Sequence, residues 1–86
     1  MVVTFFRIEG QGAKQIGTIQ FSGIELSATG EGKDFLPRLL RGVEQTDHNA
    51  VRTALQNAPK VYNGSYVRAS IEGEMRGTMR RRINAV

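Results

Sequence analysis

An alternation of apolar and polar residues on both sides of the dipeptide Ser22-Gly23 constrains the fold of this chain more than any other feature. Residues 15–21 and 24–29 are predicted to be strands that flank a two-residue turn at that dipeptide. The apolar and small residues then share one face in three cross-strand pairs: Phe21 with Ile24, Ile19 with Leu26, and Gly17 with Ala28. Because successive side chains of a strand point to opposite faces, a slip of one residue would destroy this sorting. The pattern therefore predicts a β-hairpin with one buried face.

Residues 2–8 are rich in β-branched and aromatic residues, which favour a further strand, and residues 10–14 are predicted to be the loop that joins it to the hairpin. Pairing this strand with the next adds two apolar pairs to the same face: Phe5 with Ile19 and Val3 with Phe21. Its opposite face is also apolar and carries Val2, Phe6 and Ile8. A strand of this kind lies inside a sheet or is covered on both faces. A partner subunit could supply the second cover.

Two helices are predicted between the hairpin and a last strand. The first follows a glycine-bearing loop at residues 29–33, and Asp34 is expected to cap it. The second is expected to be capped by Thr46 or Asp47 and to end at Pro59. Their apolar residues recur at helical spacing: Phe35, Leu36, Leu39, Leu40 and Val43 in the first helix, and Val51, Ala54, Leu55 and Ala58 in the second.

Residues 65–71 alternate again and are predicted to form the fourth strand, with Val67, Ala69 and Ile71 on one side. The order β-β-β-α-α-β predicts an α+β fold in a single small domain, an antiparallel sheet of four to five strands with two helices on one face. We assign the globular domain to residues 1–75. Residues 76–86 are a basic C-terminal segment that forms either an extra strand or a flexible tail.

The net charge of +4 and the isoelectric point near 10.1 suggest nucleic-acid binding until the charges are located along the chain. Residues 1–75 hold eight basic and eight acidic side chains, so the predicted globular domain is neutral. The last eleven residues hold four arginines and no acid: Arg76, Arg80, Arg81 and Arg82. These arginines are the candidate nucleic-acid-binding residues, because guanidinium groups contact phosphate readily. Tyr62 and Tyr66 could stack on unpaired bases beside them.

The composition excludes several classes of site. The chain has no cysteine, which excludes disulfides, cysteine-ligated zinc and thiol nucleophiles, and its one histidine excludes a multi-histidine metal site within one chain. No run approaches the ~20 apolar residues of a membrane helix, and the N-terminus lacks the pattern of a signal peptide. We therefore expect a cytoplasmic protein that uses no cofactor, has no metal site and does not enter a membrane.

One segment resembles a phosphate-binding loop, because Gly30, Gly32 and Lys33 lie between a predicted strand and the start of a predicted helix. Ser27 stands where such a loop has its first glycine, and Asp34 stands where it has a hydroxyl residue. The Asp34 carboxylate would also repel phosphate at the helix N-terminus. Gly30, Gly32 and Lys33 are therefore candidates for anion binding, and the alternative is an ordinary loop followed by a helix cap.

The remaining chemical candidates have simpler structural explanations. A catalytic role for His48 needs a nucleophile nearby, and the sequence nominates none, so a surface histidine in a first helical turn is the better interpretation. Glu72 and Glu74 share strand parity and could hold a divalent cation, but no third ligand is evident. An exposed ion-pair cluster with Arg76 explains them better. We therefore assign no catalytic and no metal-binding residue.

These observations predict a small non-enzymatic binding or assembly module of unknown partner. We expect it to associate with itself, as in a homodimer, through the second apolar face of residues 2–8 or through an open sheet edge. The alternative is a nucleic-acid-binding accessory protein that uses the C-terminal arginine cluster. An enzyme ranks third, because the sequence shows no nucleophile–base pair, no metal constellation and no convincing nucleotide loop.

Overall fold

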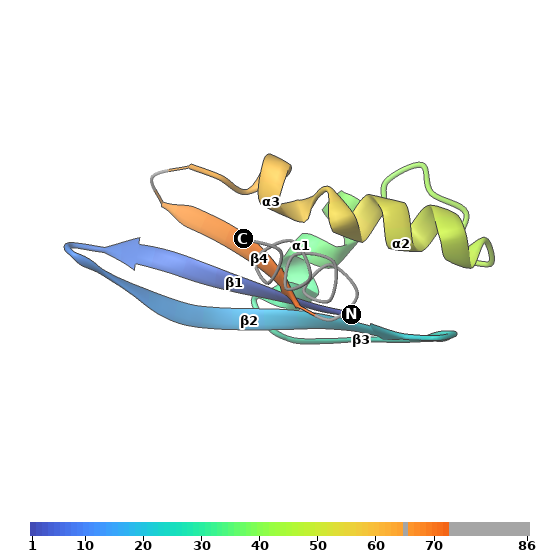
Figure 1. Cartoon of the computed structure of the whole chain (residues 1–86), viewed down its shortest axis with the longest axis horizontal. Helices are drawn as coiled ribbons and strands as arrows, with labels where there is room; N and C mark the ends of the chain where they lie inside the picture. Colours follow the sequence, from blue (N-terminus) through green and yellow to red (C-terminus); the bar gives the residue numbers. More distant parts are fainter. Residues whose placement is uncertain (65, 73–86) are drawn as a thin grey trace, which may run out of the picture.

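The computed structural model describes residues 1–64 and 66–72 and confirms the α+β fold (Figure 1). Four strands form one antiparallel sheet in the order β3-β2-β1-β4. The elements are β1 Val2–Glu9, β2 Gly12–Ser22, β3 Glu25–Gly30, α1 Gly32–Leu39, α2 His48–Gln56, α3 Ala58–Val61 and β4 Val67–Glu72. The extra strand or tail predicted at the C-terminus lies outside the described residues.

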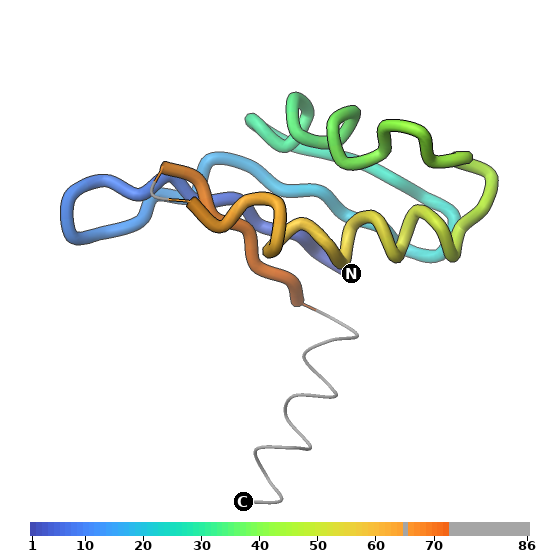
Figure 2. Tube along the Cα trace, turned by 90° about the horizontal axis from the view of Figure 1, so that it is seen from above, coloured from blue at the N-terminus to red at the C-terminus, as the bar shows by residue number. Residues whose placement is uncertain are grey.

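The helices lie in one layer on one face of the sheet (Figure 1). Seen from above, α1 lies on the β3 side of the sheet, and α2 and α3 lie toward the β4 side (Figure 2). The contacts agree, since α1 touches β2 and β3 and α3 touches β4. The strand that is apolar on both faces, β1, lies inside the sheet between β2 and β4, as its sequence predicts. Among the described residues, no helix covers its second face.

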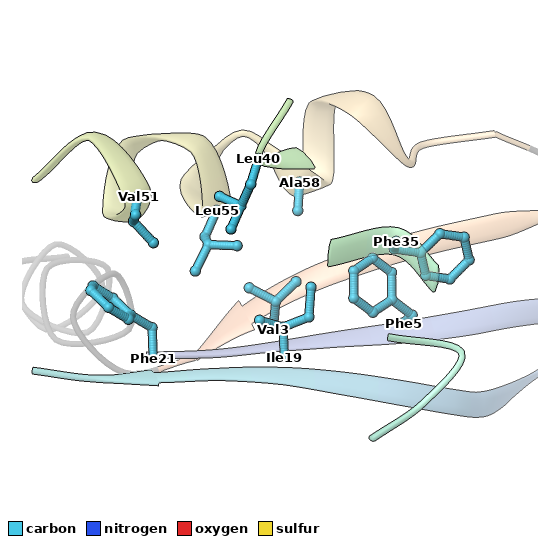
Figure 3. Close-up of a cluster of buried hydrophobic side chains, with 9 residues drawn as sticks. All are labelled: Val3, Phe5, Ile19, Phe21, Phe35, Leu40, Val51, Leu55 and Ala58. Carbon is cyan, nitrogen blue, oxygen red and sulfur yellow. The ribbon is translucent and has the colours of Figure 1, made fainter. Parts of the chain in front are cut away.

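The core lies between the helix layer and the sheet (Figure 3). Nine of the described residues bury apolar side chains there: Val3, Phe5, Ile19, Phe21, Phe35, Leu40, Val51, Leu55 and Ala58. Phe5 and Phe35 pack with their ring centroids 4.6 Å apart, and the Tyr62 ring packs on both, at 5.5 Å and 4.7 Å. The strand residues of the core all belong to the predicted apolar face, so the predicted alternation is confirmed.

The turn between β2 and β3 is shifted by one residue from the prediction. Gly23 and Ile24 form it, and Gly23 has a φ of +66°. A positive φ at the first turn position alone is the pattern of a type II′ turn, which favours glycine at that position over a residue such as Ser22. The predicted cross-strand partners are therefore wrong by two residues, although the buried face is right: Phe21 pairs with Leu26, Ile19 with Ala28, and Gly17 with Gly30.

The connection between β1 and β2 is a turn at Gly10 and Gln11, so the predicted loop at residues 10–14 is wrong. Gly10 has a φ of +56°, a conformation that glycine adopts without strain. The register shifts between Phe5 and Phe6, where Ile16 is the extra residue of a β-bulge. The shorter turn and the bulge together change the partners from those predicted: Val3 pairs with Ile19, and Phe5 pairs with Gly17.

The two predicted helix caps have different outcomes. Asp47 caps α2 as predicted, since its side chain accepts a hydrogen bond of 3.1 Å from the backbone N–H of Ala50. The prediction that Asp34 caps the first helix is wrong: α1 begins at Gly32, Glu31 is its cap, and Asp34 lies in the first turn. The second helix ends at Gln56, before Pro59, which lies in the first turn of the short helix α3. Proline is tolerated there because a first-turn N–H has no partner within the helix.

Candidate functional site

The candidate anion loop is a tight crossing of the backbone over β2. A Cβ at Gly32 would meet the carbonyl oxygen of Thr18, and a Cβ at Gly30 would meet the carbonyl oxygen of Ile16. These glycines therefore have a packing role that needs no ligand. Lys33 is exposed.

Two carboxylates also lie at the N-terminus of α1. Asp34 is in the first turn, and Glu31 at the cap position forms an ion pair of 2.8 Å with Arg7. Negative charge at a helix N-terminus opposes the binding of an anion. The electrostatic environment of this loop is therefore unfavourable for binding phosphate.

The candidate acidic and histidine sites are not brought together. His48 is exposed at the start of α2, and its ring lies 6.2 Å from the Phe21 ring. Glu72 is exposed on β4, and Glu74 lies outside the described residues. Across residues 1–64 and 66–72, no group of three or more histidine, aspartate or glutamate side chains could hold a metal ion.

The arginine cluster follows β4 in the sequence, and Arg76, Arg80, Arg81 and Arg82 all lie outside the described residues. The two tyrosines that could stack on bases differ in environment. Tyr62 is half-buried against the rings of Phe5 and Phe35. Tyr66 is 80% exposed at the start of the segment that leads into β4. Sequence reasoning treated these tyrosines alike, and the core contacts leave Tyr66 alone as a candidate for stacking.

The most distinctive surface is the side of the sheet opposite the helices, which we call the open face. The core contains the side chains of Val3 and Phe5 on β1 and of Ile19 on β2. Because side chains alternate between the two faces of a strand, the residues that alternate with these point to the open face. On β4, Val67, Ala69 and Ile71 pack against the core, which places Arg68, Ser70 and Glu72 on the open face, where all three are exposed. The apolar stripe along β1, formed by Val2, Phe6 and Ile8, is half-buried.

The strand register arranges the open face in three rows across β2, β1 and β4. Two rows are named after the charge of their residue on β4, and the third is named after its hydroxyl side chains. The acidic row is Gln20, Val2 and Glu72; the hydroxyl row is Thr18, Thr4 and Ser70; the basic row is Gln15, Phe6 and Arg68. The hydroxyl row extends to β3, because the side-chain oxygens of Thr18 and Thr29 lie 2.7 Å apart. Each row has an apolar or hydroxyl residue at its centre on β1.

The charges on this face have no partner among the described residues of the same chain. Within residues 1–64 and 66–72 the structure contains one ion pair, between Arg7 and Glu31. Glu31 is the cap residue of α1, so this pair does not lie on the open face. Arg68 and Glu72 belong to opposite rows of the open face, four residues apart on one strand. Four residues of a strand span about 13 Å, so the two side chains cannot pair with each other.

The sheet edges are less open than this face. The outer edge of β4 is partly paired, since Ala69 N–H donates to the Tyr62 carbonyl at 2.9 Å and Gly64 N–H donates to the Val67 carbonyl at 3.2 Å. At the other edge, β3 has no strand partner among the described residues. Near this edge α1 packs on β2 and β3 from the helix layer, and β3 is only six residues long, which makes it a poor template for a further strand. The open face is therefore the better candidate for an interaction surface.

Sequence reasoning found the apolar stripe on β1 but not the rows. The rows depend on cross-strand partners, and the predicted partners on β2 were wrong by two residues. One sequence pattern does indicate the rows: on β4 the polar residues alternate with the apolar ones and so share one face. These polar residues are Arg68, Ser70 and Glu72.

Within the described residues, no helix is long and apolar enough to span a bilayer. Comparison of the chain with family models, with curated proteins and with solved structures found no match. The candidate functions therefore depend on the sequence and on the geometry of this structure.

Proposed function

We propose that this protein is a non-enzymatic assembly module that associates with itself through the sheet. The observation that carries the proposal is the apolar stripe of Val2, Phe6 and Ile8 on a strand inside the sheet, facing away from the helix layer of α1, α2 and α3. Interior strands of a sheet are usually covered on both faces when both faces are apolar. Burial of these side chains against a second copy would remove apolar surface from water, at roughly 25 cal/mol for each Å².

The proposal is tested by sedimentation of the full chain over about 1 to 200 μM, the range in which a small interface is half-occupied. We expect a concentration-dependent equilibrium between monomer and dimer. Phe6→Lys places a charge in the stripe and should give a monomer. Val61→Lys is the matched control, because Val61 is an apolar residue, 60% exposed, that lies on α3 rather than on the open face. A wild-type chain that stays monomeric at 200 μM would exclude self-association.

A second candidate function is binding of single-stranded nucleic acid. It is favoured by the exposed ring of Tyr66, whose carbonyl accepts a hydrogen bond of 2.8 Å from Ile8 N–H beside the apolar stripe, and by Arg68 two residues away. An exposed aromatic ring beside a cation is a suitable surface for an unstacked base. The four C-terminal arginines could contact the phosphates.

This alternative is tested by fluorescence anisotropy with a labelled single-stranded oligonucleotide at several salt concentrations. Four phosphate contacts would give a slope of log affinity against log salt of about −2.8. Replacing Arg76, Arg80, Arg81 and Arg82 by glutamine should abolish that slope. Tyr66→Ala should weaken binding about fivefold or more, whereas Tyr66→Phe, which keeps the ring, should not. Equal binding by wild type and the four-glutamine variant would exclude the arginine cluster as the binding site.

A further inference from the structure

The open face is complementary to itself about the hydroxyl row. The acidic row and the basic row lie on opposite sides of the hydroxyl row, in the same order across β2, β1 and β4. The acidic row and the basic row each have a glutamine on β2 and an apolar residue on β1, and these two rows differ in charge only on β4. A rotation that exchanges the two rows therefore places glutamine on glutamine, apolar on apolar and acid on base.

We propose that two copies pack open face to open face about a two-fold axis that runs along the hydroxyl row, with Arg68 of each copy opposite Glu72 of the other. This inference rests on the proposed function, and it specifies the interface and the register. Face-to-face sheets lie about 10 Å apart and their strands cross at about 30°. In this arrangement Val2 packs on Phe6 of the second copy, and Thr4 lies on the axis.

The charges favour a second copy over another partner. Arg68 and Glu72 have no ion-pair partner within the described residues of their own chain. A two-fold axis gives both charges an ion-pair partner, because the contact between Arg68 of one copy and Glu72 of the other occurs twice. A shifted register would place Arg68 against Arg68 or Glu72 against Glu72 of the second copy, and like charges brought together across an interface are unfavourable. The same charges therefore set both the partner and its orientation.

The size of the face predicts a weak dimer. Strands about 4.8 Å apart and residues about 3.3 Å apart give an overlap of roughly 350 Å² of flat area per copy. This is less than the ~800 Å² of accessible surface that each partner buries in an interface of standard size. We therefore expect a dissociation constant in the micromolar range, set by the apolar stripe, with the charges acting mainly on register.

The charge pattern is tested by exchanging the two charges in the full chain and measuring the dimer dissociation constant by sedimentation equilibrium. Arg68→Glu alone and Glu72→Arg alone should each raise this constant about tenfold, because each change brings like charges together twice in the dimer. The double variant, Arg68→Glu with Glu72→Arg, should return it to within about threefold of the wild-type value. Circular dichroism establishes that each variant keeps the fold.

The axis is tested by cross-linking, which is straightforward because the chain has no cysteine. Ser70→Cys places one thiol on the axis, where the backbones of the two copies lie about 10 Å apart and the two thiols face each other, so a short bismaleimide should link the two copies. Ser22→Cys is the matched control: Ser22 is also an exposed serine, four residues beyond Thr18 on β2, so its symmetry mate lies roughly 26 Å away. We expect a covalent dimer from the first variant and little from the second.

The outcomes separate this inference from the proposed function. A wild-type monomer at all concentrations overturns both. A wild-type dimer in which the single charge reversals have no effect, or in which the double variant is not rescued, overturns the register and leaves self-association standing. Equal cross-linking of the two cysteine variants also overturns the register. Weakening by each reversal, rescue by the double variant and selective cross-linking at position 70 together support it.

Discussion

At the scale of single residues, glycine determines how closely the chain can cross the sheet. The backbone leaves β3 at Gly30 and passes over β2 at Gly32, where a Cβ would meet the carbonyl oxygen of Thr18. That carbonyl belongs to the central part of the sheet and cannot move without disturbing the ladder. The close approach fixes the start of α1 and thereby brings Phe35 over Phe5 in the core.

We predict that Gly32→Ala destabilises the fold by about 1–3 kcal/mol through this overpacking, even though alanine is the better helix former. Gly64→Ala is the control, because no atom lies within 4 Å of the position where its Cβ would stand and its φ is not in the left-handed region. Urea unfolding of both variants measures the difference. Equal stability of the two variants would show that the crossing can relax.

The core makes a second prediction at this scale. Leu55 is fully buried, so Leu55→Ala should lower the free energy of unfolding by about 2–5 kcal/mol. Ser27→Ala, on the exposed side of β3, should change it by less than about 0.5 kcal/mol. Thermal melts of the two variants compare these values. A similar loss in both would mean that the assigned buried face of the β2–β3 hairpin is wrong.

At the scale of elements, the ends of the helices show which local signals are reliable. Asp47 is an effective cap because its carboxylate reaches the N–H of Ala50. Asp34 is in a similar sequence context, but the tertiary contact of the preceding glycines starts α1 three residues earlier. A local cap signal is therefore overridden when packing fixes the path of the chain.

We predict that Asp47→Ala destabilises the protein by about 1 kcal/mol, since it leaves an N–H of the first turn without its side-chain acceptor. Asp34→Ala should cost no more than about 0.5 kcal/mol, because it loses a favourable charge near the helix N-terminus but no cap hydrogen bond. Urea unfolding at low ionic strength resolves the two. A larger loss from Asp34→Ala would contradict the assigned start of α1.

The faces of the strands could be predicted from sequence, whereas their partners could not. The buried face follows from the alternation of side chains along each strand, and a shift of the pairing by two residues leaves that face unchanged. The residues that this pattern assigns to the core are Val3, Phe5, Ile19 and Phe21. The turns decide the register, and they depend on the φ of Gly10 and Gly23. Both glycines occupy the first position of a two-residue turn. The turns therefore lie at other residues than the apolar pattern predicts, and the cross-strand partners shift with them.

At the scale of the whole molecule, the fold leaves the apolar stripe on β1 facing away from the helix layer. Within the part of the chain that the structure describes, α1, α2 and α3 lie on the other face of the sheet. In this half-buried stripe, Val2 and Phe6 are each flanked by polar residues of β2 and β4, whereas Ile8 pairs with Ala13 of β2. The candidate surface was only partly predictable, because it is formed by strands that lie more than sixty residues apart in the sequence.

Self-association makes thermal stability depend on protein concentration, since binding between folded copies favours the folded state. We predict that the Tm of the wild-type chain rises with concentration and that the Tm of Phe6→Lys does not. Differential scanning calorimetry over a hundredfold range of concentration measures both. A wild-type Tm that is independent of concentration would contradict the proposed assembly.

The opposite charges at the two ends of the β4 strand also provide selectivity between variants. On β4, Arg68→Glu carries two acids and Glu72→Arg carries two bases, so each variant should repel its own kind. Mixed together, each would find its complement in the other, with every acid facing a base. Native mass spectrometry of an equimolar mixture should then show more heterodimer than either homodimer, and the six residues of β4 would determine both which copies associate and which do not.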